Sequence, residues 1–101
     1  MINITISNPH GRFKKLEIKG HAGYAEYGKD IVCAGVSSIV GGINALERQE
    51  SFKIKCEDGD VEIEKVGNIS KHDSIVLSTM IMQLKTVAES YGNYIQIKKG
   101  N

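Results

Sequence analysis

Two residues of this 101-residue chain, Cys33 and His21, could together perform nucleophilic chemistry. Cys33 follows Asp30, a preferred N-cap residue, so its sulfur is expected in the first turn of a helix, among backbone N–H groups without intrahelical partners. This position favours the thiolate, which is the nucleophilic form of cysteine. It is also typical of a small hydrophobic residue buried beside Val32 and Val36, because free cysteine is commonly buried. The position of Cys33 leaves both interpretations open.

His21 lies where it could meet Cys33. A strand is predicted over Phe13–Lys19, and the loop Ala22–Lys29 then returns the chain to the helix that carries Cys33. A cysteine and a histidine within hydrogen-bond reach are the minimum for acyl transfer through a thioester. The spacing alone does not establish the pair, because a single histidine beside glycines is more often a turn or surface residue. Asp30 could orient the imidazole as a third member, but its N-cap role already explains an aspartate here, and we prefer the cap.

Other polar residues give weaker functional signals. Ser37 lies one helical turn after Cys33 and could line a site or bond to the helix backbone. Cys56 alternates with Ile54 in a predicted strand and has no histidine or helix start nearby, so we expect it in the core. The histidines and cysteines show no metal-ligand spacing, so no metal site is expected. An acidic hairpin, expected as a solvated face that could also steer a basic polypeptide, contains Glu57, Asp58, Asp60, Glu62 and Glu64.

The first half of the chain is predicted to form a hairpin and a helix. Isoleucines alternate at positions 2, 4 and 6, and the turn residues Asn8-Pro9-His10-Gly11 separate this strand from Phe13–Lys19 by a loop of about four or five residues. Apolar residues then recur with helical spacing from Val32 to Leu46. We place the helix at about residues 31–49, with a polar end at Glu47 to Glu50.

The second half repeats the pattern of hairpin and helix. Asp58-Gly59 is the expected turn of a second hairpin. Ser70-Lys71-His72-Asp73 resembles a capping box and opens a second helix that ends before Gly92, and a last strand covers Tyr94–Lys98. The resulting order, ββαββαβ, predicts an α+β fold. We expect one domain over residues 1–101, a two-layer sandwich of two helices on a mainly antiparallel sheet.

Composition excludes several classes of protein. Thirteen Lys and Arg residues against 12 Asp and Glu residues leave a formal net charge of +1, without the basic excess of a dedicated nucleic-acid binder. No apolar run reaches the roughly 20 residues of a membrane helix, and Met1–Ile6 does not resemble a signal peptide, so a cytoplasmic location is expected. Two cysteines are too few for a disulfide scaffold. No phosphate-binding glycine motif is present, and no cofactor is expected.

The segment from Gly20 to Ser37 closely resembles one bacterial protein family. The similarity is carried by Gly20-His21-Ala22, by a glycine-containing loop with Glu26-Tyr27-Gly28, and by Asp30-Ile31-Val32-Cys33-Ala34-Gly35-Val36-Ser37. These residues are similar to those of the ribosomal-processing cysteine proteases called Prp. The length of the chain and its ββαββαβ order also resemble that family. Many relatives have alanine where this chain has Gly35, a change between small residues that is not expected to abolish activity.

The resemblance implies a cytoplasmic cysteine endopeptidase, typically a homodimer, that removes a short N-terminal extension from large-subunit ribosomal protein twenty-seven. Relatives cut after an aromatic residue. Their catalytic cysteine matches Cys33, their catalytic histidine matches His21, and Asp30 matches an aspartate considered as a third catalytic member. The backbone amides of Cys33 and Ala34 are then expected to hold the oxyanion. A mobile substrate loop is implied, with the candidate residues Gly23, Tyr24, Glu26, Tyr27 and Gly28.

The alternative function belongs to a different class, a non-catalytic ribosome-associated module that binds RNA or protein. Its basic surface would consist of Arg12, Lys14, Lys15, Lys98 and Lys99. These residues are few and dispersed, so no direct nucleic-acid partner and no membrane partner are expected for the favoured function. Binding through such a surface should weaken steeply with salt and survive replacement of Cys33, whereas proteolysis should not survive it.

Overall fold

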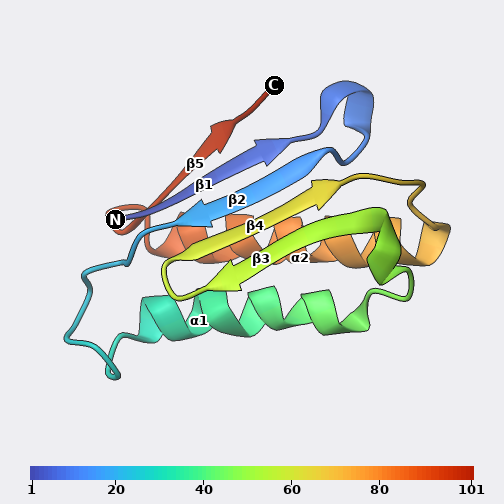
Figure 1. Cartoon of the computed structure of the whole chain (residues 1–101). Helices are drawn as coiled ribbons and strands as arrows, with labels where there is room; N and C mark the ends of the chain where they lie inside the picture. Colours follow the sequence, from blue (N-terminus) through green and yellow to red (C-terminus); the bar gives the residue numbers. More distant parts are fainter.

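The computed structural model describes all residues from 1 to 101 and contains a five-stranded sheet with two α-helices on one of its faces (Figure 1). The strands are β1 Ile2–Ser7, β2 Lys15–Lys19, β3 Phe52–Glu57, β4 Asp60–Lys65 and β5 Ile95–Lys99, and the helices are α1 Ile31–Val40 and α2 Lys71–Ser90. The strand order is β3-β4-β2-β1-β5, and only the pairing of β1 with β5 is parallel. The predicted ββαββαβ order and mainly antiparallel α+β fold are confirmed.

The core lies between the helices and the sheet, because alternate strand residues face the helices. Ile4 of β1 and Leu16 of β2 are both 0% exposed. Each helix contributes one buried stripe with helical spacing. The stripes are Val32, Val36 and Val40 on α1, and Leu77, Met80 and Leu84 on α2. The packing of α1 against the sheet fixes the helix that carries Cys33.

The first helix is shorter than the predicted span of residues 31–49. The α-helix ends at Val40, and the chain continues as a 3₁₀ helix over Gly41–Ala45. Two consecutive glycines weaken an α-helix, because glycine loses the most conformational freedom there. Gly42 also lets α2 approach closely, since a Cβ at this position would lie 2.8 Å from Cγ of Met80. Leu46 is buried as the apolar pattern required, but the backbone that carries it there is not α-helical.

The first hairpin also differs from its predicted form. β2 begins at Lys15 and not at Phe13, so the connection is longer than the expected four or five residues. A 3₁₀ turn over Pro9–Gly11 forms within it, with a left-handed φ of 56° at His10. Phe13 lies outside the strand, and its ring packs edge-on against Phe52, with ring centroids 6.4 Å apart.

The remaining elements lie close to their predicted positions. The second hairpin turns at Asp58-Gly59. The last strand covers Ile95–Lys99, one residue later than predicted. α2 ends at Ser90, with Tyr91 as its C-cap immediately before Gly92. No helix is both long enough and apolar enough to span a membrane.

Ser70 caps α2, but Asp73 does not complete the predicted capping box. The Ser70 Oγ accepts the Asp73 N–H at 3.1 Å. The Asp73 carboxylate is fully buried and accepts the N–H groups of Glu47 at 2.8 Å and of Arg48 at 3.0 Å. The Nδ1 of His72 lies 2.8 Å from Oδ1 of the same carboxylate. Asp73 therefore joins the segment after α1 to the start of α2. A local sequence pattern could not predict these long-range contacts.

The pair of His72 and Asp73 predicts a pH dependence of stability. The hydrogen bond to Asp73 is the main cause that raises the pKa of His72 above 6.5. Burial, the largest influence on Asp73, raises its pKa, but hydrogen bonds from Glu47, His72 and Arg48 together hold it below 3.8. Because folding raises the pKa of His72, the protonated imidazole stabilises the folded protein. This contribution is fully present below pH 6.5 and is lost as the pH rises through the pKa of the folded state.

We therefore expect His72→Ala to lower the urea midpoint more at pH 5.5 than at pH 8.5. The measurement is urea denaturation of both proteins, followed by circular dichroism, at the two pH values. Lys71→Ala, at the exposed neighbouring position of α2, is the control and should show no such difference. An equal loss for His72→Ala at both pH values would contradict the role of the protonated imidazole.

Candidate active site

The first turn of α1 places Cys33 at the edge of the core. Asp30 caps the helix, since its Oδ1 accepts the N–H groups of Val32 and Cys33, both at 3.0 Å. Cys33 is half-buried, and its Sγ accepts a hydrogen bond from the N–H of Ala22 at 3.3 Å. The sulfur is therefore neither a fully buried hydrophobic atom nor a freely solvated one. This environment suits a nucleophile that must be both held and reachable.

The second carboxylate oxygen of Asp30 organises the loop between His21 and Cys33. Oδ2 accepts the N–H groups of Tyr24 at 2.9 Å and of Ala25 at 3.3 Å. Desolvation, the largest influence, raises the pKa of Asp30, but four hydrogen bonds from backbone amides together hold it below 3.8. Every hydrogen bond of this side chain goes to a backbone amide and none reaches His21. The capping role is thus observed, and no contact supports an orienting role.

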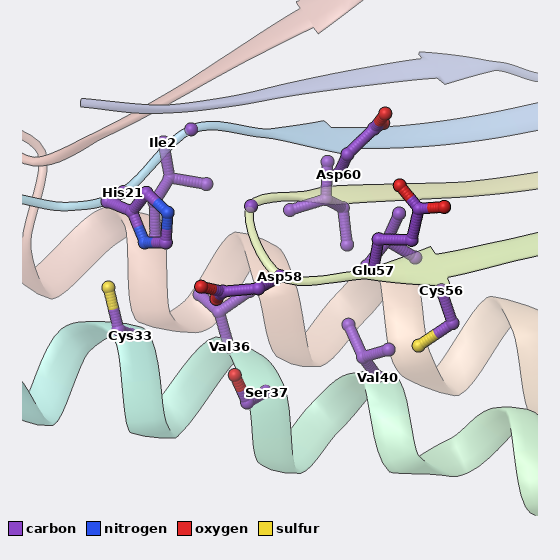
Figure 2. A pocket seen from close by; sticks show the side chains of 14 residues that line it. Ile2, His21, Cys33, Val36, Ser37, Val40, Cys56, Glu57, Asp58 and Asp60 are labelled. Atoms are coloured by element: carbon purple, nitrogen blue, oxygen red, sulfur yellow. The ribbon is translucent and has the colours of Figure 1, made fainter. Parts of the chain in front are cut away.

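His21 follows β2 directly after Gly20, and its side chain is exposed. The Gly20 N–H donates to the Gly59 carbonyl at 2.9 Å, which joins the end of β2 to the turn of the β3–β4 hairpin. The imidazole lies against this turn, since a Cβ on Gly59 would be 2.7 Å from Nε2 of His21. Figure 2 shows the Cys33 sulfur pointing from α1 towards the imidazole, and no hydrogen bond joins the two groups. The fold brings the end of β2 to the start of α1, as predicted.

Cys33 and His21 line a pocket of about 300 Å³ between α1 and the β3–β4 hairpin (Figure 2). Its apolar lining consists of Ile2, Ile18, Val36, Val40 and Val61. The hairpin contributes Cys56, Glu57, Asp58, Gly59 and Asp60. A second pocket of about 440 Å³, formed with the loop, shares His21, Cys33, Ser37 and Asp58 with the first. The thiol and the imidazole therefore lie where two pockets meet.

The five predicted residues of the substrate loop have different surroundings. Three of them line the second pocket, namely Gly23, Tyr27 and Gly28. The two glycines have φ values of 70° and 87°, a region that favours glycine, and Tyr27 is 87% exposed. Tyr24 instead packs edge-on against Tyr94, with ring centroids 5.2 Å apart, and Glu26 forms an exposed ion pair with Lys29. The pocket side of the loop is thus formed by its glycines and Tyr27.

The β3–β4 hairpin corrects two expectations. Cys56 is exposed and does not belong to the core, because β3 is an edge strand and the pocket, not a packed helix, lies beneath its end. The acidic residues of the hairpin are not one solvated face, because three of them line the pocket, namely Glu57, Asp58 and Asp60. Asp58 lines both pockets, and its place in the acidic hairpin was the only sequence signal for it.

The predicted oxyanion donors at the helix start are not free. The Cys33 N–H donates to Oδ1 of Asp30, and the Ala34 N–H donates to the carbonyl oxygen of Asp30, both at 3.0 Å. The position of Cys33 in the first turn predicts an unpartnered amide, which the side chain of Asp30 satisfies, whereas the Ala34 N–H makes the first ordinary bond of the helix. Both amides are therefore engaged within the helix start, and their role in holding the oxyanion stays a prediction.

One group of side chains has the composition of a metal site, but it lies outside both pockets. Ligand atoms of Glu47, His72 and Asp73 all lie within 4.8 Å of one another. Hydrogen bonds from backbone amides already occupy both oxygens of Asp73. Glu47 is distant in the sequence from the adjacent residues His72 and Asp73, so ligand spacing did not identify the group.

The contact between Gly59 and His21 gives a testable prediction. Gly59 has a left-handed φ of 70°, which alanine disfavours. Gly59→Ala should therefore lower the free energy of unfolding by about 1–2 kcal/mol. The new methyl group must also displace the exposed imidazole, so we expect a loss of turnover of about 10²-fold. Gly11→Ala is the matched control, because Gly11 has a φ of 74° and a methyl group there would meet no atom within 4 Å. Urea denaturation should show similar losses for both variants, whereas cleavage should fall for Gly59→Ala alone.

A thiol and an imidazole that lie at the junction of two pockets are the groups that a cysteine hydrolase uses for nucleophilic attack and proton transfer. Residues 1–96 match the family described as Cysteine protease Prp, and the chain belongs to that family. The enzyme class predicted from the sequence, a cysteine protease, is confirmed by this membership.

Individual relatives are similar to this protein in sequence or structure over nearly the whole chain. The ribosomal processing cysteine protease Prp of Staphylococcus aureus strain Mu50 is 34% identical in an alignment that is 101 residues long. The alignment covers 95% of this chain and 94% of that protein. The protein of the same name from Mycoplasma pneumoniae is 36% identical over 100 residues, covering 97% and 94% of the two chains. A crystal structure of the Staphylococcus aureus protease with a covalently linked product peptide has a TM-score of 0.87 and 33% identity, and covers 99% of this chain and all of that one.

Proposed function

We propose that this protein is an endopeptidase that removes the N-terminal extension of large-subunit ribosomal protein twenty-seven, with Cys33 as nucleophile and His21 as general acid and base. The observation that carries the proposal is the position of both side chains at the junction of two pockets. An extended peptide needs space on both sides of the bond that is cut, and the two pockets supply it. The names of the relatives support ribosomal processing, and one relative was solved with a substrate peptide.

The reaction follows ordinary acyl transfer. The Cys33 thiolate attacks the scissile carbonyl carbon, the C–N bond breaks, and His21 gives its proton to the departing amine. Water then attacks the thioester while His21 takes its proton, and the C–S bond breaks to restore the thiolate. Hydrogen bonds between catalytic groups are often long before substrate binds, which agrees with the open arrangement of Cys33 and His21.

The apolar lining of the first pocket supports cleavage after an aromatic residue. Val36, Val40 and Val61 provide a surface against which an aromatic ring can be buried. The second pocket is closed on one side by Tyr27 and two glycines with left-handed φ values. A loop of this composition can change conformation around a peptide. The cytoplasmic homodimer that the family resemblance implies stays a prediction.

The test is mass spectrometry of a peptide that spans the junction between the extension and the mature ribosomal protein. We expect the wild-type protein to cut one bond, on the carboxyl side of an aromatic residue. A peptide with alanine in place of that residue should be cut at least about tenfold more slowly, because the apolar pocket loses its occupant. Cleavage at many bonds, or none by a correctly folded protein, would contradict the proposal.

The alternative function finds little support in the surface charges. Of the five basic residues in question, Lys15 forms ion pairs with Glu17 at 3.3 Å and with Glu62 at 3.5 Å. The Lys14 ammonium group donates to the carbonyl of Asn101 at 3.2 Å. The carboxylates beside Lys15 offset part of its attraction for phosphates, which weakens this small basic surface further.

A further inference from the structure

The proposed mechanism requires a donor for the oxyanion, and the three amides of α1 next to or at Cys33 are already engaged. The N–H groups of Val32 and Cys33 donate to Oδ1 of Asp30, and the N–H of Ala34 donates to its carbonyl oxygen. Any of these amides could bind substrate only by giving up a hydrogen bond that fixes the first turn of the helix. This arrangement favours a donor for the oxyanion from another element that reaches Cys33.

One backbone amide points at the sulfur itself. The N–H of Ala22 donates to Sγ of Cys33 at 3.3 Å, and no other N–H in the chain makes such a bond. When a thiolate adds to a carbonyl group, the oxygen that becomes negatively charged is two bonds away from the sulfur. A donor that already contacts the sulfur therefore lies beside the position where the oxyanion forms.

The peptide unit that carries this N–H is fixed at both of its polar atoms. Its carbonyl oxygen, that of His21, accepts a hydrogen bond from the amino nitrogen of Met1 at 2.6 Å. One residue earlier, the Gly20 N–H is bound to the Gly59 carbonyl at 2.9 Å. Ala22 is 4% exposed and its side chain belongs to the core. A hydrogen bond to the carbonyl polarises the peptide unit, and a rigid donor needs no reorganisation during the reaction.

We propose that the Ala22 N–H is an oxyanion donor of this protease. It holds the Cys33 thiolate before attack and transfers its hydrogen bond to the carbonyl oxygen as the C–S bond forms, because the negative charge passes from sulfur to oxygen. When the tetrahedral intermediate collapses, the electron pair returns to the carbonyl, the amine leaves with the proton from His21, and the N–H remains unchanged. The inference rests on the proposed function, in which Cys33 is the nucleophile.

The position of Cys33 makes a direct test practical. A synthetic peptide of residues 1–32 can be ligated at Cys33 to a recombinant fragment of residues 33–101, which restores the full chain. Lactic acid in place of Ala22 turns one amide into an ester and removes this N–H alone. The matched control carries phenyllactic acid at Phe13, whose N–H donates to no acceptor in the protein. An all-amide ligated protein is the reference, and circular dichroism checks the fold of each.

Two reagents separate the effect on the oxyanion from the effect on the sulfur. Acylation by p-nitrophenyl acetate passes through an oxyanion, whereas alkylation by iodoacetamide does not, and peptide mapping distinguishes Cys33 from Cys56. We expect the Ala22 ester to slow acylation of Cys33 by about 10²-fold, as expected for loss of one oxyanion donor, and alkylation by less than about tenfold. Equal losses in both reactions, or no loss in either, would overturn the inference. Failure of the all-amide protein to be acylated, despite normal alkylation, would overturn the proposed function instead.

A second measurement uses the unmodified protein, in case the ester weakens the fold. The aldehyde N-acetyl-phenylalaninal adds to a thiol to form a hemithioacetal, whose oxygen occupies the position of the oxyanion. In the nitrogen–proton correlation spectrum, the Ala22 amide proton should then show the largest downfield shift of the residues 20–34. A larger downfield shift at Cys33 or Ala34 would assign the oxyanion to the helix start and overturn the inference.

Discussion

Replacing Cys33 by alanine is expected to abolish peptide cleavage while leaving the fold intact. Without the thiol no thioester can form, and loss of a nucleophile in such a site costs about 10⁴-fold or more in kcat. The structural cost is small, because Cys33 is only half-buried at the edge of the core and its side chain makes a single hydrogen bond, from the Ala22 N–H. We expect a decrease of about 0.5–1.5 kcal/mol in the free energy of unfolding.

Cys56→Ser is the matched comparison for this variant. Cys56 lines the same pocket from β3 but is exposed and lies away from the helix start. Mass spectrometry of the junction peptide should show cleavage by Cys56→Ser and none by Cys33→Ala, with similar circular dichroism spectra for both. Persistent cleavage by Cys33→Ala at the same bond would reject Cys33 as the nucleophile. Loss of cleavage in Cys56→Ser alone would move the nucleophile to β3.

His21→Ala is expected to reduce turnover by about 10²–10⁴-fold, because proton transfer to the departing amine and from water would be lost. The imidazole is exposed and its ring forms no hydrogen bond, so the free energy of unfolding should change little. Turnover is measured with the same junction peptide at saturating concentration. The loss should appear in kcat, since His21 acts on the reacting atoms more than on substrate binding.

His10→Asn provides a control with another exposed histidine. His10 lies in the turn between β1 and β2 with a φ of 56°, a conformation that asparagine tolerates. This variant should cleave at the wild-type rate. Equal activity of His21→Ala and wild type would remove the general acid and base from the mechanism. A loss confined to KM would show instead that His21 only contacts the peptide.

The sequence by itself determined the elements and the residues with chemical potential. Period-2 alternation in β1 and helical spacing in α1 and α2 depend on neighbouring residues, so the order ββαββαβ could be predicted. Asp30 could be identified as the N-cap of α1, because a cap acts within three residues of its position. The resemblance of Gly20–Ser37 to Prp then pointed to the family, which the match over residues 1–96 confirmed.

The sequence did not determine where helices end or which backbone groups are occupied. α1 stops at Val40, before two glycines that weaken the helix, and the second of them, Gly42, also leaves room for Met80 of α2. Asp73 does not complete a capping box, because its carboxylate accepts the backbone N–H groups of residues 47 and 48 instead. Both contacts, of Gly42 with Met80 and of Asp73 with residues 47 and 48, join positions more than 20 residues apart.

The active site shows the same division. The sequence supplied Cys33 and His21, but only the tertiary structure put Gly59 against the imidazole and opened a pocket beneath the end of β3. It also showed that Asp30 already holds the expected oxyanion amides, while the Ala22 N–H points at the sulfur. Residue types and local spacing determine which groups can react. Their partners depend on how strands and helices pack, because hydrogen bonds and close contacts form wherever the folded chain brings two groups together.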